Sequence, residues 1–79
     1  MKFKVSIIKL IKTDEVAPWN SNEFVFRCES KSEVFEEGKN YTEGFEKIKK
    51  TLKEGYYSIS LRNIANSNGR SKTWRIEIG

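Results

Sequence analysis

The sequence predicts a small α+β fold in which one amphipathic helix packs on one face of an antiparallel sheet of four to five strands. Alternating apolar residues near both ends of the chain indicate the strands, and a single apolar stripe with a 3.6-residue period indicates the helix between them. The predicted element order is β-β-(β)-α-β-β, with a short bracketed strand. The 79 residues, 37% of them hydrophobic, correspond to one domain over residues 1–79.

The first strand is predicted over residues 2–12, where alternate apolar residues share one face. Ile8 and Leu10 then break the alternation. This break indicates either a β-bulge near Ile7 and Ile8 or a strand end that is covered on both faces. The apolar residues of the regular part are Phe3, Val5 and Ile7.

A loop rich in turn-forming residues is expected over residues 13–22, and a second strand over residues 23–29. Val34 and Phe35 supply the short bracketed strand. We expect Cys28 to be a small buried apolar residue rather than a reactive thiol, because a cysteine nucleophile usually needs a histidine and the chain has none. One face of the second strand carries Phe24, Phe26 and Cys28.

The helix is predicted over residues 41–54. Asn40 and Glu43 have the spacing of a capping box at its start, and Gly55 is placed to end it in a left-handed cap. Gly44 either permits close packing on the sheet or indicates that the helix starts one turn later. The apolar stripe consists of Tyr41, Phe45, Ile48 and Leu52.

The last two strands, over residues 56–64 and 73–78, are predicted to form a hairpin that turns at Asn68-Gly69. Asn-Gly is the dipeptide favoured in two-residue hairpin turns. A turn at these residues fixes the register, and in that register the apolar faces of the two strands coincide. The predicted apolar neighbours are Leu61 with Ile76 and Ile59 with Ile78.

This hairpin carries the clearest candidate binding surface. The predicted register places Arg62 directly opposite Arg75 on the face away from the core, with Arg70 and Lys72 nearby. Like charges in opposing positions mildly destabilise a sheet. The cluster is therefore either the solvated face of a basic protein or a surface that contacts phosphates or carboxylates. Tyr56 shares this face and would add apolar contact.

Trp19 is a second candidate anchor, because it lies beside Pro18 in the predicted polar loop. A loop tryptophan either packs down to cap a core or remains exposed. Exposed aromatic residues are enriched among those that dominate protein interfaces. The sequence leaves these two alternatives open.

The residue types that most active sites require are scarce. The chain has no histidine, one cysteine and one aspartate, so it can build neither a Ser-His-Asp nor a Cys-His arrangement. The glycines are scattered and form no phosphate-binding loop. No segment approaches the apolar length of about 20 residues that a membrane helix needs. We therefore expect a cytoplasmic protein with no enzyme activity, cofactor, metal site or membrane contact.

The net charge of +4 mildly favours a polyanionic partner or an acidic protein surface. The favoured hypothesis is a non-enzymatic inhibitor or adaptor that occludes a larger protein partner. In its size and lack of catalytic residues the chain is similar to the small inhibitors that phages and mobile elements direct against host enzymes. Two alternatives are a nucleic-acid-binding domain that uses the basic C-terminal hairpin and a homo-oligomer whose apolar first strand pairs edge to edge with a second copy.

The opening strand Lys2-Phe3-Lys4-Val5, the second strand and the later helix resemble small antitoxins of the HicB type. The resemblance covers the first half of the chain and implies an antitoxin-like function as a further alternative. The acidic and Gly-Asp positions that precede the helix in that family are not reproduced here. No functional residue is therefore carried over from it.

Overall fold

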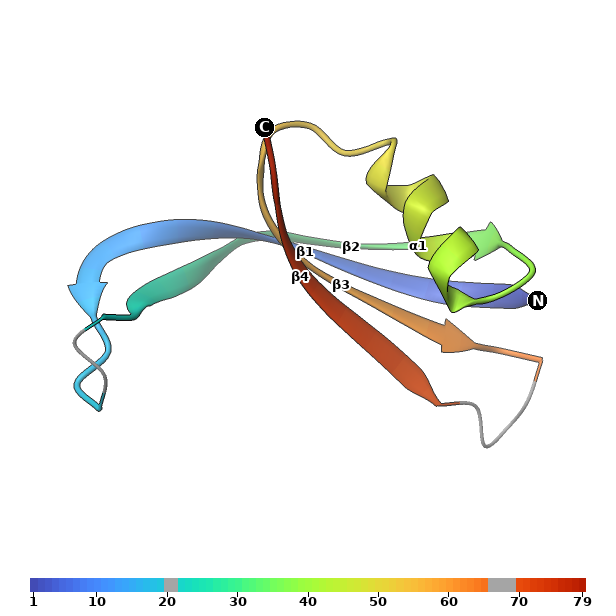
Figure 1. The fold of residues 1–79 in the computed structure, drawn as a ribbon, viewed down its shortest axis with the longest axis horizontal. Helices are drawn as coiled ribbons and strands as arrows, with labels where there is room; N and C mark the ends of the chain where they lie inside the picture. The colour runs from blue at the N-terminus through green and yellow to red at the C-terminus, as the bar shows by residue number, and fades with distance from the viewer. Residues whose placement is uncertain (20–21, 66–69) are drawn as a thin grey trace.

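The computed structural model describes residues 1–19, 22–65 and 70–79 and shows four strands and one helix (Figure 1). Neighbouring strands are antiparallel, in the spatial order β2-β1-β3-β4. The predicted α+β class, with a small antiparallel sheet and a single helix, is confirmed. No helix in the described part of the chain is long and apolar enough to cross a membrane. The elements are β1 Lys2–Val16, β2 Phe24–Glu37, α1 Tyr41–Lys49, β3 Gly55–Asn63 and β4 Ser71–Ile78.

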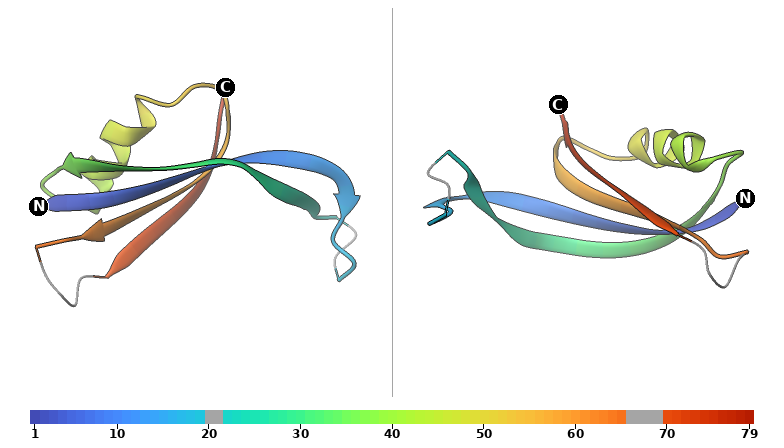
Figure 2. Two further views of the ribbon diagram at one scale, coloured as in Figure 1. Left: turned by 180° about the vertical axis from the view of Figure 1, so that it is seen from behind. Right: turned by 60° about the horizontal axis from the view of Figure 1, so that its bottom comes forward.

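The core lies between α1 and one face of the two central strands, β1 and β3 (Figure 2). Alternate residues of a strand point to the same face, so the apolar alternation of β1 and β3 turns one apolar side toward the helix. Phe45 of α1 stacks on Trp74 of β4 with ring centroids 4.4 Å apart. The fully buried side chains are Phe3, Val5, Ile59 and Leu61.

Gly44 lies where α1 comes closest to the sheet. A Cβ atom at this position would lie 2.8 Å from Cδ2 of Leu61 and 2.9 Å from Cδ2 of Phe3. Such distances are far below an ordinary van der Waals contact. Of the two explanations offered for Gly44, close packing on the sheet is correct, and the helix starts where it was predicted to start.

The helix ends earlier than predicted. Its last residue is Lys49, and Lys50 follows as a right-handed C-cap. Gly55 does have a positive φ of 151°, but it begins β3 rather than ending the helix. The chain turns toward the sheet before this point, and the hydroxyl of Tyr57 donates a 2.8 Å hydrogen bond to the carbonyl of Lys53. The left-handed cap at Gly55 was therefore a wrong prediction.

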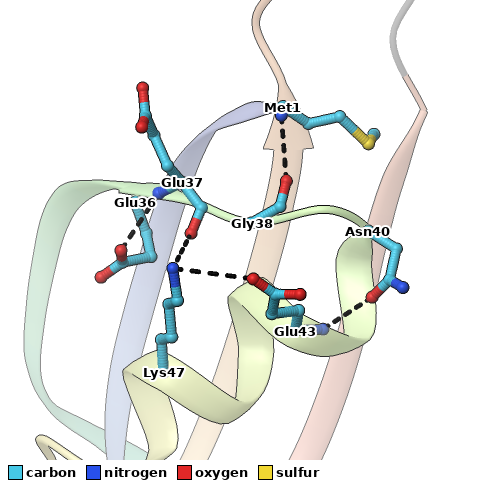
Figure 3. A network of polar contacts seen from close by, with 7 residues as sticks. All are labelled: Met1, Glu36, Glu37, Gly38, Asn40, Glu43 and Lys47. Carbon is cyan, nitrogen blue, oxygen red and sulfur yellow. Dashed lines mark hydrogen bonds and ion pairs between the residues drawn. The ribbon is translucent and has the colours of Figure 1, made fainter.

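The helix begins at the predicted cap. The side-chain Oδ1 of Asn40 accepts a 2.8 Å hydrogen bond from the backbone N–H of Glu43 (Figure 3). We expect Asn40→Ala to lower the free energy of unfolding by about 1 kcal/mol, because it leaves that N–H without its acceptor. Urea denaturation measures the loss. Asn40→Asp keeps an acceptor oxygen and should lose much less, so equal losses for the two variants would contradict the capping role.

Further polar contacts join the start of α1 to the ends of β1 and β2 (Figure 3). The ammonium of Lys47 donates to the carbonyl of Glu37 at 2.9 Å and lies 3.7 Å from the carboxylate of Glu43. The amino group of Met1 donates to the carbonyl of Gly38 at 2.9 Å. These contacts hold the short connection between β2 and α1 against the sheet.

β2 is one strand of 14 residues. It includes Val34 and Phe35, which pair with Val5 and Lys4 of β1, so the separate short strand was a wrong prediction. No turn interrupts β2 at residues 30–32, because these residues pair with residues 7–9 of β1. Cys28 is exposed rather than buried as expected, because it pairs with Leu10 on the face of the sheet opposite α1.

A β-bulge interrupts the β1–β2 ladder, but its extra residue lies on β2 and not on β1 near Ile7 and Ile8 as predicted. Lys9 pairs with Ser30, whereas Leu10 pairs two positions further back, which leaves Glu29 as the extra residue on β2. The ammonium of Lys9 lies 3.5 Å from the carboxylate of Glu29. β1 itself keeps its alternation, so Ile8 and Leu10 lie half-buried on the face opposite α1.

β3 and β4 form a hairpin, but its register differs from the predicted one by four residues. Arg75 pairs with Ser58, and Arg62 pairs with Ser71. The predicted turn at Asn68-Gly69 lies outside the described residues. A shift by an even number of residues leaves the same side chains on each face. The apolar pattern therefore fits both registers, and it could not exclude the wrong one.

β1 occupies the centre of the sheet, with β2 on one side and β3 on the other. Over residues 3–10 both edges of β1 are paired, one with β2 and the other with β3, so this part of the strand cannot pair edge to edge with a second copy as expected. The free edges of the sheet belong to β2 and β4.

Candidate functional site

β1 and β2 continue beyond the sheet as a two-stranded arm, formed by residues 11–19 and 22–28 and seen at the left of Figure 1. The pairing of β1 with β3 ends at Leu10, whereas β1 and β2 remain paired as far as Val16 and Phe24. The four residues 13–16, predicted as loop, are therefore strand. A nine-residue helix is only about 14 Å long, so α1 cannot cover a molecule whose longest dimension is 41 Å.

Hydrogen bonds between its two strands order the arm. The hydroxyl of Thr13 donates to the carbonyl of Val25 at 2.8 Å, and the N–H of Ala17 donates to the carbonyl of Glu23 at 2.9 Å. Ala17 is itself buried, which closes the end of the strand pair. The arm is therefore an ordered element held by its own hydrogen bonds, although it lies outside the main core.

The apolar side chains of the arm are exposed. Trp19 is 81% exposed, so of its two predicted alternatives the exposed one is correct. Single exposed apolar residues are ordinary, but several on one projecting element are typical of an interaction surface. The exposed apolar residues of the arm are Ile11, Val16, Trp19, Phe24 and Phe26.

Two aromatic rings of the arm, those of Phe24 and Phe26, contact neighbouring side chains. The ammonium of Lys12 lies 3.7 Å from the centre of the Phe24 ring, a cation–π distance. The ring of Phe26 lies 5.3 Å from that of Tyr56 on β3. The second contact connects the arm to the sheet, so the apolar surface continues from one to the other.

A shallow groove of about 250 Å³ lies at the base of the arm, where β1, β2, β3 and β4 meet. Its lining is mostly apolar, with one cation and one anion contributed by β4. A groove with apolar walls and a few polar groups suits a side chain or short segment of a partner. The lining residues are Leu10, Phe26, Tyr56, Tyr57, Arg75, Ile76 and Glu77.

The structure divides the six predicted site residues into two groups. Tyr56 and Arg75 line the groove, and Trp19 lies on the arm that starts there. The other three lie toward the opposite end of the hairpin. These are Arg62, Arg70 and Lys72.

The predicted cluster of four cations does not form. Arg62 lies four residues along the strand from the position opposite Arg75, a separation of about 13 Å. Lys72 pairs with core-facing Leu61 and extends over the ring of Trp74, so it lies on the helix side of the sheet. The assumed two-residue turn placed all four residues together, and the observed register moves Arg75 away from the other three.

Three lysines of β1 have acidic neighbours on β2. Lys2, Lys4 and Lys9 lie 4.0, 3.4 and 3.5 Å from the carboxylates of glutamates across the strand pair. Exposed pairs of this kind add little stability. They do place negative charge beside the cations of β1, which interrupts a positive surface along that strand. Their partners are Glu37, Glu33 and Glu29, respectively.

Sequence reasoning missed Leu10 and Phe26 as site residues. The sequence did contain a signal for them, because its strands have more apolar faces than one helix can cover. The second strand had an apolar face of its own, and the end of the first strand had apolar residues on both faces. One amphipathic helix covers one apolar surface. The excess apolar positions therefore had to remain partly exposed or contact another molecule.

Within residues 1–19, 22–65 and 70–79, no three His, Cys, Asp or Glu side chains gather into a group that could hold a metal ion. The comparisons with protein-family models, curated proteins and solved structures found no match for this chain. The candidate site is therefore defined by its own geometry, as an exposed apolar arm that leads into an apolar groove.

Proposed function

We propose that this protein is a non-enzymatic binding module whose arm and groove dock on a larger protein partner and occlude part of its surface, as an inhibitor or an adaptor would. The observation that supports this proposal is the continuity of the apolar surface. It runs from Phe26 at the base of the arm through Tyr56 into the groove, and Trp19 is a further exposed apolar residue of the same arm.

The arm suits insertion into a concave surface. Its strands are already hydrogen-bonded, so less conformational freedom is lost on binding than for a flexible loop. Aromatic side chains bring large contact area with few rotatable bonds, and they dominate the energetics of many interfaces. Trp19 and Phe24 are the anchors we assign to the arm, and Tyr56 is the anchor at its base.

The charges of this surface favour a protein partner over nucleic acid. The arm carries cations and acids together, among them Lys12, Arg27, Glu15 and Glu23. Binding to nucleic acid depends on many lysines and arginines that contact phosphates, and it weakens steeply as salt increases. A surface dominated by apolar contact should instead retain its partner at moderate salt.

The test is affinity capture from the source organism with the wild-type protein and a double arm variant, Trp19→Ser with Phe24→Ser. We expect the arm variant to bind the captured partner at least about tenfold more weakly, because two exposed anchors are removed. Phe35→Ser is the matched control, since Phe35 is 72% exposed but lies on β2 outside the arm. Equal loss in the control and the arm variant would contradict the assigned surface.

A parallel assay addresses the alternative partner. Electrophoretic shifts with DNA and RNA at two salt concentrations should show no complex of comparable affinity. A shift that falls steeply with salt and is lost in Arg62→Ala would instead support the nucleic-acid hypothesis. The identity of the captured protein tests the proposed setting, in which a phage or mobile element inhibits a host enzyme.

A further inference from the structure

The two edge strands of the sheet differ in how open they are to pairing. β2 carries the bulge at Glu29, so the alternation of side chains before the bulge is out of phase with the alternation after it. A bulge of this kind is a common protection of edge strands against further pairing. β4 pairs with β3 along its whole length without a register shift, and it contains no proline.

The sequence of β4 is complementary to itself in one antiparallel register. When two copies are aligned so that Ile76 faces Ile76, Arg75 of each copy lies opposite Glu77 of the other. In the same register Trp74 of each copy lies opposite Ile78 of the other. Opposite charges and aromatic–aliphatic neighbours are the cross-strand pairs that stabilise antiparallel sheets.

The faces of the strand agree with this register. Ile76 and Trp74 pair with buried Tyr57 and Ile59, which places them on the side of α1. Arg75 pairs with Ser58 on the other side. This register pairs odd-numbered residues with odd-numbered ones and even-numbered residues with even-numbered ones, so paired side chains lie on the same face of the sheet. The opposite charges therefore meet on one face, and the apolar residues meet on the other.

β4 also presents incompletely buried apolar residues along its free edge. Trp74 is covered on one side by the ring of Phe45, yet it remains half-buried, as do Ile76 and Ile78. A neighbouring strand with its own apolar face toward the helix side would complete their cover.

We propose that two copies of this chain associate through β4, antiparallel and centred on Ile76, to form one continuous eight-stranded sheet. This inference concerns self-association and does not depend on the proposed partner. Arg75 and Glu77 also line the groove, so dimerisation is measured in the absence of any partner. The arm variant Trp19→Ser with Phe24→Ser should dimerise like the wild type, which separates failure of one proposal from failure of the other.

The first experiment is sedimentation equilibrium of the wild type over about 5–500 µM, because one strand pair is a small interface. In the proposed dimer, residue 75 of each copy faces residue 77 of the other. Arg75→Glu therefore places two carboxylates opposite each other in both of these pairs, and Glu77→Arg places two guanidinium groups opposite each other. We expect each variant to dimerise at least about tenfold more weakly than the wild type. Arg27→Glu, on the other edge strand, is the matched control and should leave dimerisation unchanged.

The reversal of both charges gives the sharper test. The variant with Arg75→Glu and Glu77→Arg in one chain restores the opposite-charge pairs and should dimerise like the wild type. An equimolar mixture of the two single variants should form the mixed dimer in preference to either homodimer, because only the mixed dimer pairs opposite charges throughout. Native mass spectrometry distinguishes the three species when one variant is isotopically labelled.

A cross-link tests the centre of the register. In the proposed dimer the two copies of Ile76 face each other within the Cα separation that a disulfide requires. Ile76→Cys in a Cys28→Ser background should therefore form a covalent dimer on mild oxidation, whereas Thr73→Cys in the same background should not. A wild type that stays monomeric throughout the concentration range would overturn the proposal, as would equal cross-linking of both variants or a weak double-reversal dimer.

Discussion

Phe3→Ala is expected to lower the free energy of unfolding by about 3–5 kcal/mol, because it removes a large ring from the centre of the core. Phe3 is fully buried, and its ring lies 5.0 Å from that of Tyr41. A domain of this length is stabilised by only about 4–12 kcal/mol in total. The variant should therefore be partly unfolded at room temperature, which urea denaturation followed by circular dichroism measures.

Phe35→Ala is the control for this change. It removes the same side chain from a paired strand of the same sheet, but Phe35 is 72% exposed. We expect its effect to stay within about 0.5 kcal/mol, as is usual for surface substitutions. Similar losses for the two variants would show that the face of the sheet opposite α1 is covered in solution.

Gly44→Val is expected to lower the free energy of unfolding by about 3 kcal/mol or more, although helix propensity alone would favour the replacement. Replacing a helical glycine normally stabilises the helix, because the backbone loses freedom in the unfolded chain. Here the added side chain would enter the contact between α1 and the buried side chains of Phe3 and Leu61. Filling a closely packed space forces side chains and backbone to move, and α1 would have to shift away from the sheet.

Gly44→Ala should fall between the wild type and Gly44→Val, because its single methyl group meets the same two side chains. Thr42→Val is the matched control, since Thr42 is an exposed residue of the same helix and the change adds no buried volume. Thermal and urea denaturation of the three variants give the order of stability. A stabilising Gly44→Ala would contradict the close approach of α1 to the sheet.

The fold class followed from patterns that act over short stretches of the chain. The alternation of Phe3, Val5 and Ile7 and the stripe through Phe45 and Ile48 each have one physical explanation, a half-covered strand and a half-covered helix. The cap at Asn40 was equally local. These elements could be predicted because the same residues that form them also bury their apolar faces.

The register of the last hairpin could not be predicted from the same kind of pattern. Binary patterning distinguishes odd from even shifts but not one even shift from another. The observed register places Trp74 opposite Ile59, where Phe45 of the helix stacks on the tryptophan ring. That contact joins residues far apart in the chain, and no local rule contains it.

The arm was missed for a related reason. Turn-forming residues around Pro18 indicated a loop over residues 13–22. In the structure the strand continues to Val16, because Val16 pairs with Phe24 of β2. The groove required the bulge at Glu29 and the position of Tyr56 beside Phe26, which are tertiary facts. Of the arm, only the exposure of Trp19 was among the alternatives that the sequence offered, and of the groove only Tyr56 and Arg75 were candidate site residues.

β1 belongs both to the core and to the arm, and its backbone runs through the two without a break. Phe3 and Val5 lie under the helix, and Ile11 and Val16 lie on the arm. The arm and the core are therefore built on the same paired strand, and opening of the core would also disturb the base of the arm. Amide hydrogen exchange at Phe3 and Val5 should slow when a partner restrains the arm, so the core would report an event at the far end of the molecule.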